Sequence, residues 1–159
     1  MLRHFGRAGK LAPGLALTAA VVPVFAVIHL MSLLTRPLAL PLTALTLYVG
    51  AFVLFWFAVA ATHGRGLAAC FQGQVPVKVV QAGPYRAIRH PFYASYTLVW
   101  IGGFAATGWW PLALTAFFMA SLYAYAARQE ERCFLNSPLR KEYRDYMRRT
   151  GRFLPRTRT

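Results

Sequence analysis

Long apolar stretches separated by short polar ones dominate the pattern of the chain. Apolar runs extend over residues 11–34, 38–61, 92–107 and 109–127. At a rise of ~1.5 Å per residue, the first two are long enough to cross the ~30 Å hydrocarbon core of a bilayer. The third is short for an independent span, so we interpret the last two runs as a helical hairpin that turns at Gly108. The pattern predicts an all-α, polytopic membrane protein with about four transmembrane helices.

A different periodicity follows the fourth apolar run. Ser137 suits the N-cap of a helix, Pro138 suits its first position, and Gly151 suits its end. Between them, apolar side chains recur at three- and four-residue spacing, as on one face of a helix; they are Leu139, Tyr143, Tyr146 and Met147. We therefore predict a C-terminal amphipathic helix, and treat residues 1–159 as a single membrane domain.

The basic residues indicate how the chain crosses the membrane. Its formal net charge is +14, and 18 residues are Lys or Arg. Three of them precede the first run, one lies in the turn at Arg36, four lie in the connector 62–90, none lies at the Gly108 turn, and ten follow Ala127. The positive-inside rule then places both termini and the connector in the cytosol. In a bacterium this would be an inner-membrane protein with several passes.

The basic residues and the cysteines also bear on two other kinds of partner, nucleic acids and metal ions. Because the basic residues bracket apolar runs, we interpret them as topology signals and expect no nucleic acid partner. The two cysteines, Cys70 and Cys133, lack the spacing of metal ligands, and we expect no metal site. A lone histidine within the first apolar run, His29, is unusual in a membrane span, and we favour either a bond to a neighbouring helix or a position near a membrane interface for it.

Residues 83–96 contain a dense group of arginine, histidine and aromatic side chains. Pro91 suits the first position of a helix, with His90 just outside it. The free N–H groups and the positive dipole end of that helix would lie beside Arg86, Arg89 and His90. Such an arrangement attracts a small anion, a carboxylate or a phosphate.

The acidic residues lie far along the chain but should return to this place. All four acids fall in the last thirty residues, at Glu130, Glu131, Glu142 and Asp145. His90 is eighteen residues before Gly108, and Glu130 is twenty-two after it. An antiparallel hairpin therefore brings the two glutamates to the depth of His90. A ligand with both a carboxylate and an ammonium group would match this pairing.

These segments resemble the signature of a known family. The pieces are Gly83-Pro84-Tyr85, Arg89-His90-Pro91-Phe92-Tyr93, Glu130-Glu131, Glu142-Tyr143 with Tyr146, and Arg152-Phe153-Leu154-Pro155. In this order and spacing they look like the isoprenylcysteine carboxyl methyltransferase family of membrane enzymes. The resemblance covers residues 77–155. It departs from the family at Ser95, where glycine is common, and at Leu139-Arg140, where Phe-Gly is usual.

The resemblance implies S-adenosylmethionine as cofactor and a lipophilic acceptor that enters from the membrane lipids. The implied cofactor-binding residues are Lys78, Val79, Val80, Tyr85, Arg89, His90, Pro91, Phe92, Tyr93, Glu130 and Glu131. The implied catalytic residues, near the acceptor, are Arg128, Glu142 and Arg148. The resemblance favours carboxyl O-methylation of a prenylcysteine-like group.

The residues themselves leave the acceptor open. Methyl transfer from a sulfonium rests mainly on orientation and desolvation. A carboxylate acceptor needs a cation, which Arg128 or Arg148 could supply, whereas an amine acceptor must lose a proton, for which Glu142 is a candidate. Phospholipid N-methylation is thus one alternative. Membrane reductases of the sterol type, which use NADPH and share a similar Arg-His-Pro element, are another, and a non-enzymatic scaffold is a third.

The position of Glu131 in its helix also predicts how a substitution there affects protein stability. A negative charge near the C-terminus of a helix opposes the helix dipole. On this ground alone, Glu131→Gln should leave the stability of the ligand-free protein unchanged or slightly higher.

The topology can be tested by labelling single cysteines from outside the cell. Positions 5, 75 and 155 should resist a membrane-impermeant reagent, because all three are expected in the cytosol. A cysteine near position 108 should react. Labelling at position 75 from outside would refute both the topology and a cytosolic site.

Overall fold

The computed structural model describes residues 39–62 and 78–156, together with Val27, Met31 and Leu34. Over these residues the fold is all-α, with four α-helices and a short 3-10 helix. They are α2 (Ala39–Thr62), η2 (Gly83–Arg86), α3 (Pro91–Thr107), α4 (Trp110–Leu135) and α5 (Arg140–Arg149). The rest of the first predicted span, including His29, and connector residues 63–77 lie outside the described residues.

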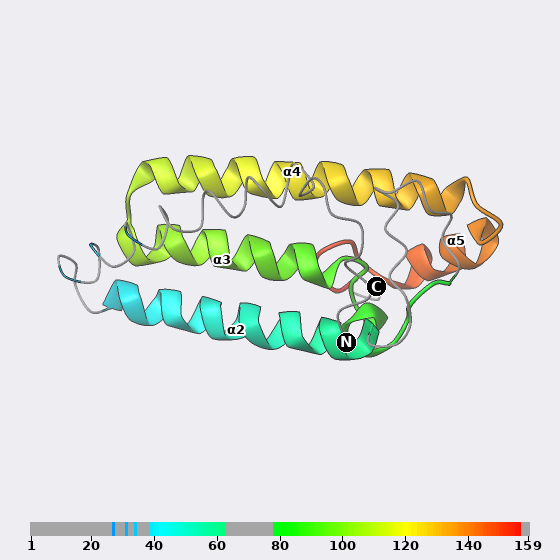
Figure 1. Ribbon diagram of the computed structural model, residues 1–159, viewed down its shortest axis with the longest axis horizontal. Coiled ribbons are helices and arrows are strands. Elements are labelled where there is room, and N and C mark those ends of the chain that lie inside the picture. The colour runs from blue at the N-terminus through cyan, green and yellow to red at the C-terminus, as the bar shows by residue number, and fades with distance from the viewer. Residues whose placement is uncertain (1–26, 28–30, 32–33, 35–38, 63–77, 157–159) are drawn as a thin grey trace, which may run out of the picture.

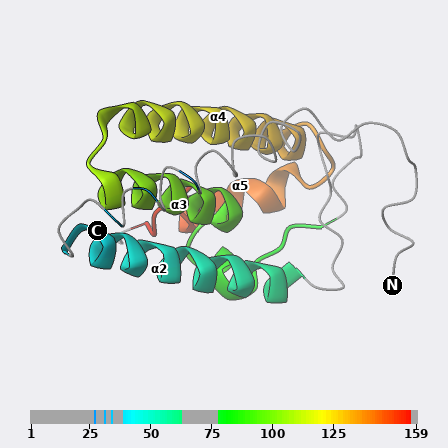
Figure 2. The same cartoon turned by 60° about the vertical axis from the view of Figure 1, so that its left-hand side comes forward.

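The three long helices lie side by side in an antiparallel arrangement (Figure 1). α3 is in the middle and packs against both α2 and α4. The end of α2, the start of α3 and the end of α4 meet at one end of this bundle, where η2 and α5 also lie (Figures 1 and 2). We call this the α5 end of the bundle. All the sequence segments that resemble the family signature lie at this end.

The second and third apolar runs form helices as predicted. α2 begins one residue after the predicted start, and α3 begins at Pro91 with His90 as its N-cap. The hairpin turn is also confirmed, since Gly108 adopts the left-handed conformation (φ 62°) that ends α3 and that favours glycine. These boundaries could be predicted because proline and glycine mark them.

The predicted end of the fourth helix is wrong by eight residues, and the predicted start of the fifth is wrong by two. α4 continues eight residues past Ala127, to Leu135, because the charged segment after Ala127 has no glycine or proline to stop a helix. α5 begins at Arg140, two residues later than Pro138. The Ser137 hydroxyl accepts a hydrogen bond from the Leu139 N–H (3.2 Å) and donates one to the Phe134 carbonyl (2.8 Å). Ser137 therefore shapes the turn between the helices.

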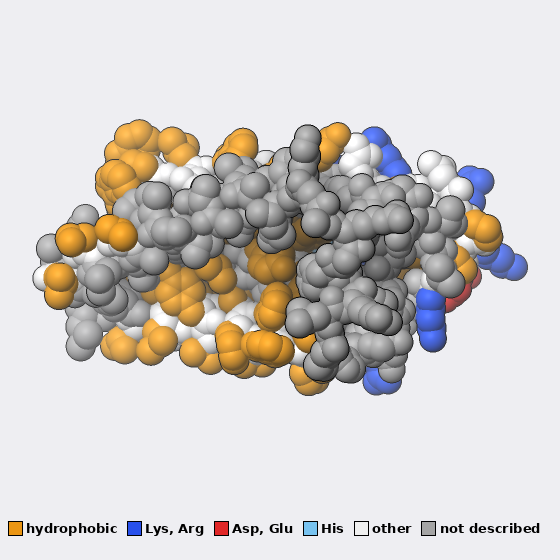
Figure 3. Space-filling model, viewed as in Figure 1, with side chains coloured by type: hydrophobic (Ala, Val, Ile, Leu, Met, Phe, Trp, Pro, Cys, Tyr) orange, Lys and Arg blue, Asp and Glu red, His pale blue; other side chains and the backbone are white. Residues whose placement is uncertain are grey.

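Two described stretches are long and apolar enough to cross a membrane by length and composition, Leu42–Thr62 and Trp110–Leu135. Both expose large apolar side chains; they include Phe52, Trp56, Phe57, Phe117 and Phe118. Figure 3 shows hydrophobic side chains along the bundle and Lys and Arg side chains at the α5 end. Apolar sides with one basic end suit a bundle that sits in lipid and reaches water at that end.

A close contact holds α2 against α3. A Cβ added at Gly102 would lie 2.7 Å from the Tyr48 ring of α2, closer than carbon atoms can approach. Gly102 itself is buried. The missing side chain at this position therefore lets the Tyr48 ring pack directly on the backbone of α3.

Gly102→Ala should lower the thermal stability of the purified protein by about 1–3 kcal/mol, because the Tyr48 ring must move to admit the methyl group. Gly50→Ala is the matched control, since a Cβ at Gly50 of α2 would meet nothing within 4 Å. Thermal unfolding in detergent compares the two. Equal melting temperatures for both variants would show that the helices do not pack closely at this point.

Candidate functional site

The backbone of the tail lies alongside the segment that leads into α3. The Arg89 N–H donates to the Gly151 carbonyl (2.9 Å), the His90 N–H donates to the Arg152 carbonyl (3.1 Å), and the Gly151 N–H donates to the Ala87 carbonyl (3.1 Å). Ile88 and Gly151 form a parallel bridge. A Cβ at Gly151 would lie 1.7 Å from the Leu154 carbonyl oxygen, so only glycine fits here. Residues 87–90 are thereby held by a segment more than sixty positions later.

Glu131 lies at the centre of the α5 end. Its side chain, on α4, is only 5% exposed and contacts two guanidinium groups. Arg89 Nε donates to Oε1 at 2.9 Å, while Arg152 donates to Oε1 from Nε at 3.1 Å and to Oε2 from Nη2 at 2.6 Å. Hydrogen bonds between ionised groups are about twice as strong as neutral ones. The two arginines thus offset both the burial of the carboxylate and its unfavourable position near a helix C-terminus.

Arg89 also caps the end of α5. Its Nη1 donates to the carbonyls of Met147 (3.3 Å) and Thr150, and its side chain is only 9% exposed. A cation at a helix C-terminus satisfies free carbonyl groups and complements the dipole. Arg89 therefore joins the start of α3, the end of α4 and the end of α5.

His90 lies between the two glutamates. Its Nδ1 is 3.4 Å from Glu130 Oε2, and its Nε2 is 3.4 Å from Glu131 Oε1. Burial alone would lower the pKa of His90, but the nearby carboxylates of Glu130 and Glu131 outweigh burial and raise it above its ordinary value. Its buried Nε2 nevertheless makes no hydrogen bond of good geometry with any described residue. A buried polar atom in this state suits contact with a ligand.

Aromatic rings form the side of the site that lies along α3 and α4. Tyr93 stacks between His90 (ring centroids 5.7 Å apart) and Tyr123 (5.5 Å), and Phe153 of the tail lies 6.0 Å from His90. The Tyr93 hydroxyl donates to Glu130 Oε1 at 2.6 Å. Glu130 is the more accessible glutamate, with 26% of its side chain exposed against 5% for Glu131.

The structure brings five of the predicted site residues together: Arg89, His90, Tyr93, Glu130 and Glu131. The hairpin geometry that placed the glutamates opposite His90 is confirmed. Pro91, buried, begins the helix. Tyr85 is also buried, and its carbonyl accepts a hydrogen bond from the Tyr146 hydroxyl (2.7 Å).

The connector residues lie at the edge of this group. Val79 is buried against Tyr143 and Tyr146 of α5, whereas Lys78 is exposed. Val80 packs against Ala58, Ala61 and Tyr85 together with Phe92. Val79 and Val80 thus contribute their side chains to the packing of α5 and α2.

The three predicted catalytic residues lie elsewhere. Arg128, Glu142 and Arg148 are all exposed, and none makes an ion pair with a described residue of the Glu131 cluster. Glu142 instead accepts a hydrogen bond from Gln81 Nε2 (3.3 Å). In the described part of the chain, the carboxylate near His90 with an exposed portion is Glu130.

Three residues of the site were absent from the predicted set: Tyr123, Arg152 and Phe153. Arg152 and Phe153 belong to the Arg-Phe-Leu-Pro segment. This segment is part of the family signature, and that membership was the sequence signal that could have identified them. No sequence signal pointed to Tyr123, because an aromatic residue inside an apolar helix is expected to pack in the core or face lipid.

The residues present fit S-adenosylmethionine, which carries ammonium, carboxylate and sulfonium groups. The exposed portion of the Glu130 carboxylate suits a cation, and the Nε2 of His90, which makes no well-aligned hydrogen bond with a described residue, suits a hydrogen-bonding group. Described His, Cys, Asp and Glu side chains form no group of three that could hold a metal ion.

Comparison with known proteins gives one match. The family described as phospholipid methyltransferase matches residues 38–142, about two thirds of the chain. This family belongs to the same superfamily of membrane methyltransferases as the isoprenylcysteine carboxyl methyltransferases, and the match does not single out the latter. No curated protein and no solved structure matches the chain significantly.

The ion pairs reverse the expectation for Glu131→Gln. Removing this charge leaves Arg89 buried without a carboxylate, so the variant should lose about 3 kcal/mol of stability even without ligand. Glu142→Gln is the control, because Glu142 is exposed and bonded only to Gln81 among the described residues. Thermal unfolding in detergent measures both. A Glu131→Gln protein as stable as wild type would mean that helix-dipole relief outweighs the two arginine contacts.

Proposed function

The chain belongs to the phospholipid methyltransferase family, and we propose that it moves a methyl group from S-adenosylmethionine to the amine of a membrane phospholipid headgroup. The observation that carries this choice of acceptor is the partly exposed carboxylate of Glu130, held by Tyr93 and His90 at the end of an apolar bundle. An amine needs such a group, whereas a carboxylate acceptor does not.

Position in the bundle supports a lipid acceptor. The long helices expose large apolar side chains along their length. Glu130 lies near the C-terminal end of α4, at the α5 end of the bundle, where Figure 3 shows Lys and Arg side chains. A phospholipid in the surrounding bilayer carries its headgroup at this same boundary. Its amine would reach the site without leaving the membrane.

Electrostatics favours an amine over a carboxylate. A protonated amine is attracted by the partly exposed carboxylate of Glu130. A carboxylate in the same place would be repelled by Glu130, and the cations proposed to hold it, Arg128 and Arg148, are exposed and outside the cluster. We therefore place N-methylation ahead of the carboxyl O-methylation that the sequence resemblance favoured.

In our proposal, Glu130 is the proton acceptor. The ammonium form of the acceptor gives its proton to Glu130, and the nitrogen lone pair then forms the new N–CH₃ bond. When bound, S-adenosylmethionine supplies a methyl group on a sulfonium, whose sulfur keeps the electron pair of the broken bond. Tyr93 and His90 orient the carboxylate through their contacts with its two oxygens. Glu131 positions His90 from the other side and takes no part in proton transfer.

Full-length protein in lipid nanodiscs, supplied with S-adenosylmethionine labelled in its methyl group, tests this function. Label should enter phosphatidylethanolamine and not a farnesylcysteine analogue. Glu130→Gln should lower kcat by about 100-fold near neutral pH, because the amide cannot accept the proton, and higher pH should restore part of the rate. Glu142→Gln should retain most activity.

Three results would contradict the proposal. Transfer of label to the farnesylcysteine analogue but not to the lipid would identify a carboxylate acceptor. Loss of activity in Glu142→Gln with normal rates in Glu130→Gln would move the proton acceptor to α5. Binding of NADPH without any methyl transfer would favour the reductase interpretation.

A further inference from the structure

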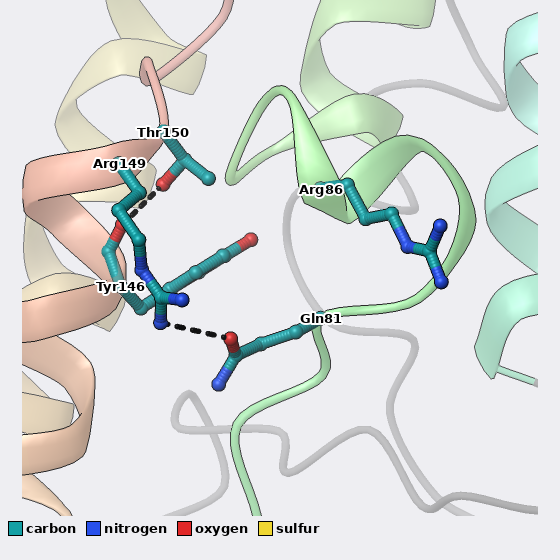
Figure 4. Close-up of a pocket in the computed structure, with 5 residues that line it drawn as sticks. All are labelled: Gln81, Arg86, Tyr146, Arg149 and Thr150. Carbon is teal, nitrogen blue, oxygen red and sulfur yellow. Dashed lines mark hydrogen bonds between the residues drawn. The ribbon is translucent and has the colours of Figure 1, made fainter.

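A pocket lies at the α5 end, apart from the Glu130 and Glu131 carboxylates. Its volume is about 300 Å³, and it lies between η2, the segment before η2, and α5; its lining residues are Gln81, Arg86, Tyr146, Arg149 and Thr150. Figure 4 shows Tyr146 and Arg149 on α5 with the Gln81 side chain pointing toward Arg149; Arg86 lies across from them, with its guanidinium group directed away. Pockets of this size are at the small end of those that hold ligands.

The lining is cationic and has no carboxylate. Arg149 Nη2 donates to Gln81 Oε1 (3.3 Å) and its Nε donates to the Asp145 backbone carbonyl (3.3 Å), so both contacts are with neutral acceptors. Arg86 is exposed and forms no ion pair with a described residue. Glu142 contacts the lining only through Gln81, whose Nε2 donates a hydrogen bond to Glu142 Oε1 (3.3 Å). Arg86 and Arg149 thus line the pocket from opposite sides, and neither has a carboxylate partner among the described residues.

We propose that this pocket binds a phosphate group. Arginine is the side chain best matched to phosphate oxygens, because its planar N–H groups can donate in pairs. The Gln81 amide can turn to donate as well, since its Nε2 end is held only by the exposed Glu142 among described residues. The source of the phosphate is either an anionic lipid of the surrounding membrane, reached at the basic end of the bundle, or a small soluble phosphate.

The site is separate from the proposed methyl-transfer chemistry but shares its framework. Tyr146 and Thr150 line the pocket, while the Tyr146 hydroxyl bonds Tyr85 and the Thr150 carbonyl accepts from Arg89. The lining residues Arg86 and Arg149 contact neither glutamate of the cluster. Phosphate binding can therefore be measured with a lipid that has no amine and cannot be methylated.

Isothermal titration calorimetry on the full-length protein in neutral detergent and phosphate-free buffer tests the proposal. The two probes are short-chain phosphatidylglycerol and inorganic phosphate. Arg86→Gln and Arg149→Gln should each weaken binding of the probe about tenfold, equivalent to about 1.4 kcal/mol. Arg140→Gln is the matched control, because it removes an exposed arginine of α5 that does not line the pocket. Binding by this control should equal that of wild type.

The pattern of binding identifies the source. Saturable binding of both probes with the expected variant effects supports recognition of phosphate itself, and binding of phosphatidylglycerol alone supports a lipid headgroup. Absence of binding by either probe overturns the proposal. Equal weakening in Arg140→Gln and Arg149→Gln also overturns it, because attraction would then come from overall charge. None of these results depends on methyl transfer.

Discussion

The contact of one buried carboxylate with two arginines holds the α5 end of the bundle together. Glu131 comes from α4, Arg89 from the segment before α3, and Arg152 from the tail. Each of these elements would otherwise end in free polar groups or in an uncompensated charge. Because Arg89 also binds the last carbonyls of α5, one cluster of charges fixes the relative positions of three helices. The neighbouring His90 and Glu130 are placed as a consequence of this cluster.

The sequence allowed the fold to be predicted where single residues stop a helix. Pro91 and Gly108 mark the limits of α3, and both were assigned correctly. The end of α4 was not, because the change from apolar to charged residues after Ala127 alters solvation without altering helix propensity. Hydropathy locates the part of a helix that suits lipid, while capping and proline locate its ends.

The candidate site could be predicted in part, and for a clear reason. Hairpin geometry relates residues on two consecutive helices, so the approach of Glu130 to His90 followed from counting. The tail is joined to the hairpin by a turn whose direction no periodicity specifies, so the contact of Arg152 with Glu131 could not be obtained in that way. Because the direction of this turn could not be predicted, Glu142 was a candidate catalytic residue, although α5 presents it to solvent beside Gln81.

The pairing of residues 87–90 with 151–152 has a consequence for the order of events during synthesis. Ribosomes deliver the chain from its N-terminus, so α2, α3 and α4 leave the ribosome, and can enter the bilayer, ahead of Gly151 and Arg152. Until then, the Glu131 carboxylate has no Arg152 and the backbone N–H groups of Arg89 and His90 have no carbonyl partners from the tail. Insertion and assembly of the site are therefore separate steps, and a nascent chain in the membrane cannot yet hold His90 in its final position.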